Sequence, residues 1–251
     1  MMGLRDLYKV FSETRRSSRE RATLAVVGDS PRVAELADHF GAQRTMRRAE
    51  VILTVSGDAI SLSGKGVEDP GEIPLPDPGA PLDLLAPRVV KALDDDYLVA
   101  LAKGYPALRR AVCEEIIRQN ARQNAVVGLL PIPGADMPVM TANQARMVLK
   151  IAAAHDVELS FQRARELLGV LAAGFGLRAL TRQVVKVVPV GGWAAAAAIG
   201  YAGTVAMGRS TILYFERGGQ KIGEEETEEI RRRATEEAKA FVSRLRRKRG
   251  T

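Results

Sequence analysis

Apolar residues between positions 82 and 175 recur at spacings of three and four, the period of helices that bury one face. The pattern predicts an almost entirely helical region. A longer helix opens at Pro106, a residue type that fits the first turn of a helix, and runs to about Gln123. Further helices are expected after Asp136 and after Ser160, since both residue types suit the N-cap position.

The first 80 residues follow a different pattern. Continuous apolar runs at 23–28 and 51–55 predict buried strands, and an amphipathic helix is expected between them at 33–40. Ile60 and Leu62 predict a short third strand, and the Pro/Gly-rich segment from Gly64 to Pro81 predicts an irregular loop. Strand, helix and strand in this order indicate a small parallel α/β unit.

The predicted fold class is therefore α+β: a small N-terminal α/β unit, then a mainly helical domain with a small-residue helical hairpin. We expect four segments: an amphipathic helix at 1–21, a small degenerate α/β unit with its Pro/Gly-rich loop at 22–80, a helical domain at 81–220, and a charged C-terminal helix at 221–251.

The run from Val187 to Gly208 holds 22 residues without a charged side chain, between Lys186 and Arg209. Small residues recur in it every four positions, which places them on one helix face and lets a second helix approach closely. This predicted helix-packing face consists of Gly192, Ala196, Gly200, Thr204 and Gly208. It also suits self-association into a homo-oligomer.

Two interpretations of this run stay open. Its length suffices to cross a bilayer core of about 30 Å. However, 12 of the 22 residues are alanine or glycine, and membrane insertion rewards larger apolar side chains. The composition favours close helix–helix packing inside the protein over a membrane span.

The C-terminal segment predicts a solvated helix, with Glu228–Arg232 and Glu229–Arg233 as i,i+4 pairs. A narrow apolar seam runs along it at Ile230, Ala234, Ala238, Phe241 and Leu245. The helix ends in a basic tip that suits contact with anionic lipid or RNA. The tip consists of Arg244, Arg246, Arg247, Lys248 and Arg249.

The formal net charge of +7 points to an anionic neighbour. With only 5% aromatic residues and no basic cluster interleaved with them, nucleic-acid binding by base stacking is not expected. A single cysteine, Cys113, in a chain without a disulfide framework or a predicted signal peptide predicts a reducing, cytoplasmic location. This prediction includes a protein that lies at the cytoplasmic face of the inner membrane or is inserted into that membrane.

The sequence offers little catalytic chemistry. The loop after the first strand, Gly28-Asp-Ser-Pro-Arg, lacks the second glycine and the lysine that a phosphate-binding loop requires. His39 and His155 have no partners at metal-ligand spacing. We therefore expect no catalytic residue, no cofactor and no metal, and a protein that is not an enzyme.

A proline-rich turn separates two predicted helices of the helical domain. Pro131, Pro133 and Gly134 kink the chain, and Asp136 then stands where an N-cap belongs. A carboxylate in a nearly charge-free stretch would mark a functional polar site if it lay in a membrane, but the cap explains it. Asn143, Gln144 and Arg146 follow on the next helix and are candidates for a polar patch.

Several motifs resemble those of one bacterial helical family. They are Asn124-Ala-Val-Val-Gly-Leu-Leu-Pro-Ile-Pro-Gly-Ala-Asp136, Asn143-Gln144, Ala154-His155-Asp156, Arg163-Ala-Arg-Glu-Leu-Leu168, Val188-Pro-Val-Gly-Gly192 and Tyr214-Phe-Glu-Arg-Gly-Gly219. Together, over residues 107–219, they resemble domain-of-unknown-function family 697, which includes the YcjF-like proteins. The resemblance implies a helical domain that accompanies a GTPase and is linked to a membrane, and it brings no catalytic residues.

This chain departs from the family pattern upstream, where relatives can carry a working GTPase domain. The α/β unit here lacks phosphate-binding residues, so it is either a degenerate GTPase-like domain or an unrelated one. The sequence favours a non-catalytic protein associated with a membrane or a partner GTPase. Two alternatives remain: a soluble scaffold or regulator with a buried helical hairpin, and a nucleotide-dependent enzyme.

Overall fold

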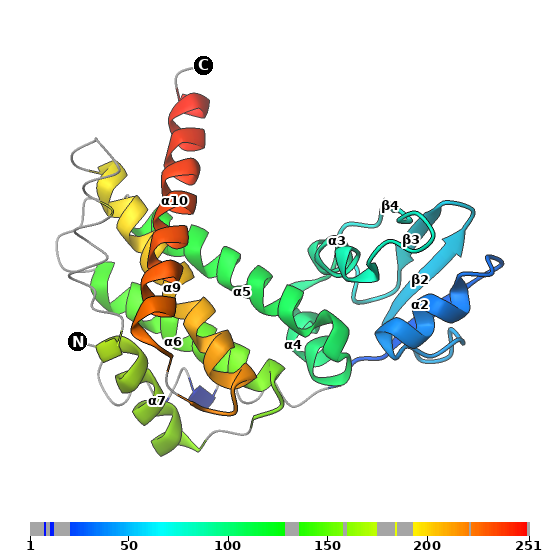
Figure 1. Ribbon diagram of the computed structural model, residues 1–251, viewed down its shortest axis with the longest axis horizontal. Helices are drawn as coiled ribbons and strands as arrows, with labels where there is room; N and C mark the ends of the chain where they lie inside the picture. Colours follow the sequence, from blue (N-terminus) through cyan, green and yellow to red (C-terminus); the bar gives the residue numbers. More distant parts are fainter. Residues whose placement is uncertain are drawn as a thin grey trace. The chain divides into compact units, whose positions relative to one another are not determined.

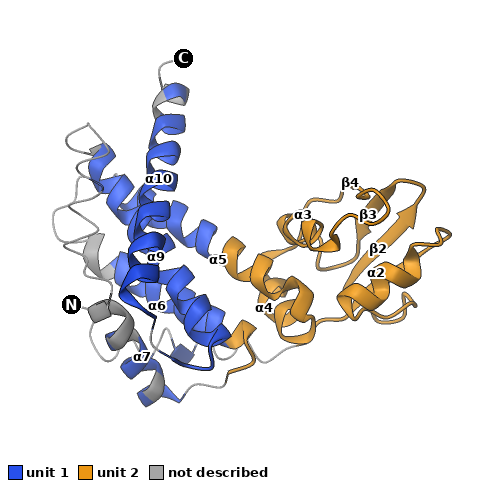
Figure 2. Cartoon of the chain, in the orientation of Figure 1, with its two compact units in different colours: residues 1–14, 116–152, 158–251 blue, residues 15–115, 153–157 orange. Residues whose placement is uncertain are grey.

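The computed structural model describes residues 8, 11–12, 21–128, 136–157, 160–174, 184, 193–220 and 222–249. The chain forms two compact units (Figure 2). Unit 1 comprises residues 1–14, 116–152 and 158–251, and unit 2 comprises residues 15–115 and 153–157. These units follow tertiary contacts, and the four segments expected from composition stay a prediction.

Unit 2 contains a four-stranded sheet with the strand order β1-β2-β3-β4 (Figure 1). Its strands are β1 (Leu24–Gly28), β2 (Val51–Ser56), β3 (Ala59–Ser63) and β4 (Glu72–Pro74). β1 pairs parallel with β2, with Val26 opposite Leu53. The pairs β2–β3 and β3–β4 are antiparallel. The small N-terminal sheet unit is confirmed, but its sheet is mixed rather than parallel throughout.

The strand β4 lies inside the segment predicted to be an irregular loop, and that prediction is wrong for residues 72–74. Ile73 pairs with Ile60 of β3 and is buried. Pro74 is tolerated because β4 is an edge strand and the backbone nitrogen of position 74 faces away from β3, whereas the next amide, that of Leu75, donates to the Asp58 carbonyl. The proline and glycine content correctly predicts the turns around β4. It does not predict the strand itself, which depends on the burial of a single isoleucine.

The glycine that ends β1 has a structural explanation. A Cβ at Gly28 would lie 2.0 Å from the carbonyl oxygen of Val55 on β2, and its φ of +141° is a conformation that L side chains rarely adopt. The helix α2 (Val33–Phe40) follows and buries Leu36, Ala37 and Phe40. Gly28 is therefore explained by the close approach of the neighbouring strand, without a ligand.

Short helices complete the N-terminal part of unit 2. They are the 3-10 helix η1 (Leu82–Leu84), α3 (Ala86–Lys91) and α4 (Asp95–Gly104). The Asp94 carboxylate caps α4 by accepting a hydrogen bond from the Asp96 amide at 2.8 Å. After α4, the Tyr105 hydroxyl accepts a 2.7 Å hydrogen bond from the backbone amide of Leu24. This bond ties the end of α4 to the first strand.

Two long helices, α5 (Pro106–Val127) and α6 (Asp136–Ala154), contribute residues to both units. The turn after α6 belongs to unit 2. Asp156 adopts the left-handed region with φ 58°, and its carboxylate pairs with Lys103 at 3.6 Å and Arg21 at 3.8 Å. Beside it, burial and the nearby Arg109 guanidinium lower the pKa of His155 to about 4.

This shift predicts that the stability of unit 2 depends on pH. The folded state disfavours protonated His155, so the unfolded chain binds more protons between about pH 6.5 and about pH 4. Stability is therefore full above pH 6.5 and falls as the pH is lowered through that range. We expect urea unfolding of His155→Gln to lose less stability than the parent between pH 7.5 and pH 5. Equal pH dependence in both proteins would contradict the assignment.

Unit 1 is built from helices: parts of α5 and α6, together with α7 (Phe161–Gly174), α9 (Trp193–Glu216) and α10 (Glu224–Arg249) (Figure 1). The mainly helical C-terminal region is confirmed. Among the N-terminal residues, Phe11 is buried in a cluster with Ala145, Leu149 and Ala164, and its ring meets Phe161 edge-on at 5.7 Å. The rest of the helix expected at 1–21 lies almost wholly outside the described residues.

The described part of the uncharged run begins at Trp193, the first residue of α9. Within the described ranges, none of the helices has both the length and the apolar character needed to cross a bilayer.

Candidate functional site: the packed face of α9

The helices α5 and α9 touch backbone to backbone at two glycines, one on each side of the contact. A Cβ at Gly200 of α9 would lie 2.8 Å from the carbonyl oxygen of Asn124 on α5. Conversely, a Cβ at Gly128, which directly follows α5, would lie 2.9 Å from the carbonyl oxygen of Ala196. Real Cβ atoms essentially never come this close to such atoms. The interface therefore requires glycine at both positions.

A third contact lies at the end of the uncharged run. A Cβ at Gly208 would lie 2.4 Å from the Ile117 side chain of α5. Positions 196, 200 and 208 thus meet positions 128, 124 and 117, so the residue number rises along one helix as it falls along the other. The two helices are antiparallel.

The structure places the described members of the predicted helix-packing face together. Gly200, Thr204 and Gly208 are buried at the contact with α5, whereas Ala196 meets it only through its backbone carbonyl and is exposed. Gly192 lies outside the described residues. The partner of this face is a helix of the same chain, which explains why the run is rich in small residues without any reference to lipid.

A chain of polar side chains crosses the same interface. The Asn124 side-chain amide donates to the Thr204 hydroxyl at 2.8 Å, and that hydroxyl donates to the Gly200 carbonyl at 2.8 Å. From α6, the Asn143 amide donates to the Asn124 side-chain oxygen at 3.0 Å. Asn124 and Thr204 are each 0% exposed. Buried polar groups are costly unless paired, so these bonds select one alignment of α5, α6 and α9.

The candidate polar patch on α6 is partly drawn into this chain of hydrogen bonds. Asn143 belongs to it, and Arg146 donates to the Asn143 side-chain oxygen at 3.4 Å. Both are half-buried. Asn124 is the member that sequence reasoning missed. In the sequence, Asn124 is marked only by lying one helical turn before Gly128. That spacing indicates a shared contact only when α9 is known to lie opposite both residues.

The helix α10 covers another side of α9 (Figure 1). Four of its apolar residues are buried: Ile230, Ala234, Ala238 and Val242. Phe241 stacks on Tyr201 of α9 with ring centroids 4.7 Å apart, and Arg209 pairs with Glu237 at 2.6 Å. Three of the five predicted seam residues are therefore buried and Phe241 forms the aromatic stack, while Leu245 is half-buried.

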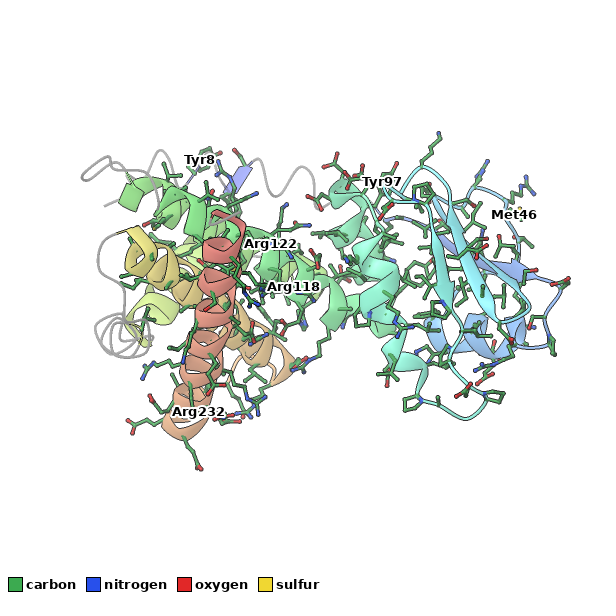
Figure 3. All side chains as sticks on the ribbon, turned by 90° about the horizontal axis from the view of Figure 1, so that it is seen from above. Tyr8, Met46, Tyr97, Arg118, Arg122 and Arg232 are labelled. Atoms are coloured by element: carbon green, nitrogen blue, oxygen red, sulfur yellow. The ribbon has the colours of Figure 1, made fainter. Side chains whose placement is uncertain are left out.

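Three arginines lie around Tyr201. Burial raises the pKa of Tyr201 and Glu237 raises it further, while Arg122, Arg244 and Arg118 act in the opposite direction. Arg118 and Arg122 belong to α5 and lie beside α10 in Figure 3. Arg244 belongs to the basic tip predicted from the sequence. Arg118 and Arg122 do not stand out in the sequence, because only the fold brings them to α10.

Of the basic tip, Arg244 and Arg247 have described side chains, and both are exposed. Arg246, Lys248 and Arg249 are described only as part of the α10 backbone. In the proline-rich turn, Pro131, Pro133 and Gly134 lie outside the described residues. Asp136 is the first residue of α6. Its side chain is not among those described, so its capping role stays a prediction.

The arrangement joins α5, α6 and α9 through side-chain hydrogen bonds. The polar groups of the α9 face bond to one another and to backbone carbonyls. Among the residues placed by the structure, no three His, Cys, Asp or Glu side chains gather as metal ligands would. The site is thus a three-helix contact bordered on one side by arginines.

Comparison with known proteins bears on residues 94–240. No curated protein and no solved structure matches the chain. The model of one family, described as a domain of unknown function (DUF697), matches residues 94–240, a span wider at both ends than the motifs recognised in the sequence. It includes α5, α6, α9 and their shared interface, and it stops within α10. The chain therefore belongs to the DUF697 family.

Proposed function

We propose that this protein is a non-catalytic helical protein that works at the anionic cytoplasmic face of a membrane, together with a partner GTPase. The observation that carries the membrane part is the distribution of charge between the two units. Unit 1 holds 23 lysines and arginines against 13 aspartates and glutamates, whereas unit 2 holds 14 against 17. Their formal net charges are +10 and −3, so the positive charge of the chain resides in the helical unit.

Electrostatics gives this distribution its meaning. Anionic lipids create a negative surface potential that attracts basic segments by about 1 kcal/mol for each lysine or arginine near the surface. A protein whose excess charge is concentrated in one unit is recruited and oriented by that unit. Peripheral attachment of this kind needs no membrane-spanning helix, and it leaves the α9 face in its contact with α5.

The GTPase part is supported by family resemblance alone. The loop after β1 lacks the lysine and the second glycine of a phosphate-binding loop, and Asp29 follows Gly28 directly. Any nucleotide chemistry would therefore belong to the partner, and this chain would act as its helical adaptor.

A flotation experiment tests the proposal. The full chain is expected to float with phosphatidylcholine vesicles that contain phosphatidylglycerol, and not with phosphatidylcholine alone. Raising the sodium chloride concentration should release it, because at 0.1 M salt charges more than about 10 Å apart are already screened. Calorimetric titration of the same protein with GTP should give no binding heat. Absence of flotation at low salt, or GTP binding at micromolar concentration, would overturn the corresponding part of the proposal.

A second candidate, a scaffold that works away from any membrane, is favoured by one observation. The small-residue face of α9 is engaged inside the protein by α5, so the run from Val187 to Gly208 needs no lipid to explain it. Under this alternative the chain would stay in the lipid-free fraction at every salt concentration.

A further inference from the structure

Charge is divided along the length of α10. Residues 224–237 contain seven glutamates and three arginines, whereas residues 238–249 contain six lysines and arginines and no acidic residue. The three arginines of the first part form ion pairs with glutamates of the same helix: Arg231 with Glu228, Arg232 with Glu229 and Glu236, and Arg233 with Glu229. The positive charge of this helix is therefore compensated in its first part and concentrated in its second.

A second helix adds cations at the same place. Arg118 and Arg122 are one turn apart on α5. Glu114 and Glu115 precede Arg118 by about one turn, and no acidic residue occurs between positions 116 and 127 of that helix. Figure 3 shows both arginines beside α10, while Arg232 lies on another part of that helix. Tyr201 of α9 marks the meeting point, because its ring stacks on Phe241 and Arg244 follows Phe241 by three residues.

Helix electrostatics explains only part of this arrangement. Cations near a helix C-terminus are favourable because they complement the macrodipole, which accounts for the basic end of α10. It does not account for Arg118 and Arg122, which lie more than one turn before the C-terminal end of α5, where the dipole effect has fallen off. The family match also ends at residue 240, so the basic end of α10 lies beyond it while Arg118 and Arg122 lie within it.

We propose that Arg118, Arg122 and Arg244 form a binding surface for the phosphates of anionic lipid headgroups, which we term the α5–α10 basic surface. Guanidinium groups suit this role because their N–H donors match phosphate oxygens in bidentate geometry. This inference rests on the proposed function and names the part of unit 1 that makes the contact.

Two features favour lipid over nucleic acid. The aromatic rings at this surface are engaged with each other, and Tyr201 is 6% exposed, so no base can stack on it. One turn beyond Arg122 on α5, Val126 is 55% exposed. An apolar side chain beside cations can enter the headgroup region of a bilayer, whereas it gains nothing from a phosphodiester backbone.

Matched variants test the surface. Arg118→Gln, Arg122→Gln and Arg244→Gln together remove three charges from it. The control, Arg217→Gln, Arg232→Gln and Arg233→Gln, removes three charges elsewhere in unit 1, from the residue after α9 and from the glutamate-rich first part of α10. Both triple variants have the same net charge. With vesicles containing phosphatidylglycerol, the surface variant should bind about a hundredfold more weakly than the parent. The control should bind within about threefold of the parent.

The outcomes separate the two proposals. If the parent floats and both variants weaken equally, binding follows net charge, and the α5–α10 basic surface is wrong while the proposed function stands. If the parent does not float, both fail. The parent could instead bind a single-stranded RNA more tightly than it binds the vesicles, with only the surface variant losing that binding. This result would assign the surface to nucleic acid and overturn the lipid proposal. Should circular dichroism show misfolding of the triple variant, Arg122→Gln and Arg244→Gln alone should each weaken binding about fivefold.

Discussion

Replacing Gly200 with alanine is expected to lower the free energy of unfolding of unit 1 by about 2 kcal/mol. The added Cβ meets the Asn124 carbonyl at 2.8 Å and the Met140 terminal methyl at 3.1 Å. Because the carbonyl belongs to the backbone of α5, the helices must separate, and overpacking of this kind costs about 1–3 kcal/mol or more. The better helix propensity of alanine recovers about 1 kcal/mol of the loss.

The larger change Gly200→Leu is expected to prevent α9 from docking on α5 altogether. Trp193 is the sole tryptophan and opens α9, so urea unfolding followed by tryptophan fluorescence reports on this helix directly.

Gly169→Ala is the matched control for Gly200→Ala. Gly169 lies within α7, and an added Cβ there would meet nothing within 4 Å. That variant should gain up to about 1 kcal/mol from helix propensity. Similar behaviour of the two alanine variants would disprove the close contact.

Removing the side chain of Asn124 is expected to cost about 3 kcal/mol. In Asn124→Ala, the Thr204 hydroxyl loses a donor and the Asn143 amide loses its acceptor. A buried polar group left without its partner costs about 1–3 kcal/mol, and the cavity adds to the loss.

The control for this experiment lies one turn earlier on the same helix. Asn120 is half-buried, and its side-chain amide donates to the Ile116 carbonyl of its own helix at 2.8 Å, so Asn120→Ala should change stability by about 0.5 kcal/mol or less. Combining Asn124→Ala with Thr204→Val closes a double-mutant cycle. A coupling energy of about 1 kcal/mol or more is expected for a pair in direct contact. Additive losses would show that the two side chains do not interact in solution.

Local patterns predicted the elements of this chain well where one face of an element is buried. The strands β1 and β2 are continuous apolar runs, and α5 begins at Pro106 as expected. Among the ion pairs of α10, Glu229–Arg233 forms as predicted at 2.6 Å. Arg232 was predicted to pair with Glu228 but pairs with Glu229 and Glu236. A long arginine side chain can reach several carboxylates within one turn, so sequence spacing alone does not determine its partner.

The candidate site shows the same limit at a larger scale. Four-residue spacing placed small residues on one face of the α9 helix, since helical geometry relates positions within a single element. Which helix packs against that face depends on the tertiary fold of the chain. Asn124 is 80 residues away from Thr204 in the sequence and bonds to it, and no periodicity within either helix encodes that distance.

The sequence by itself determined the α+β class, the family, the small-residue face and the excess of positive charge, because each of these follows from composition or from spacing along one element. Only the tertiary structure decided that the face meets α5 at Gly128 and Asn124, and that Arg118 and Arg122 join Arg244 beside Tyr201. The physical reason is that contacts between helices depend on which turns are brought together. That choice is made by packing and by buried hydrogen bonds over long sequence separations, beyond the reach of any local pattern.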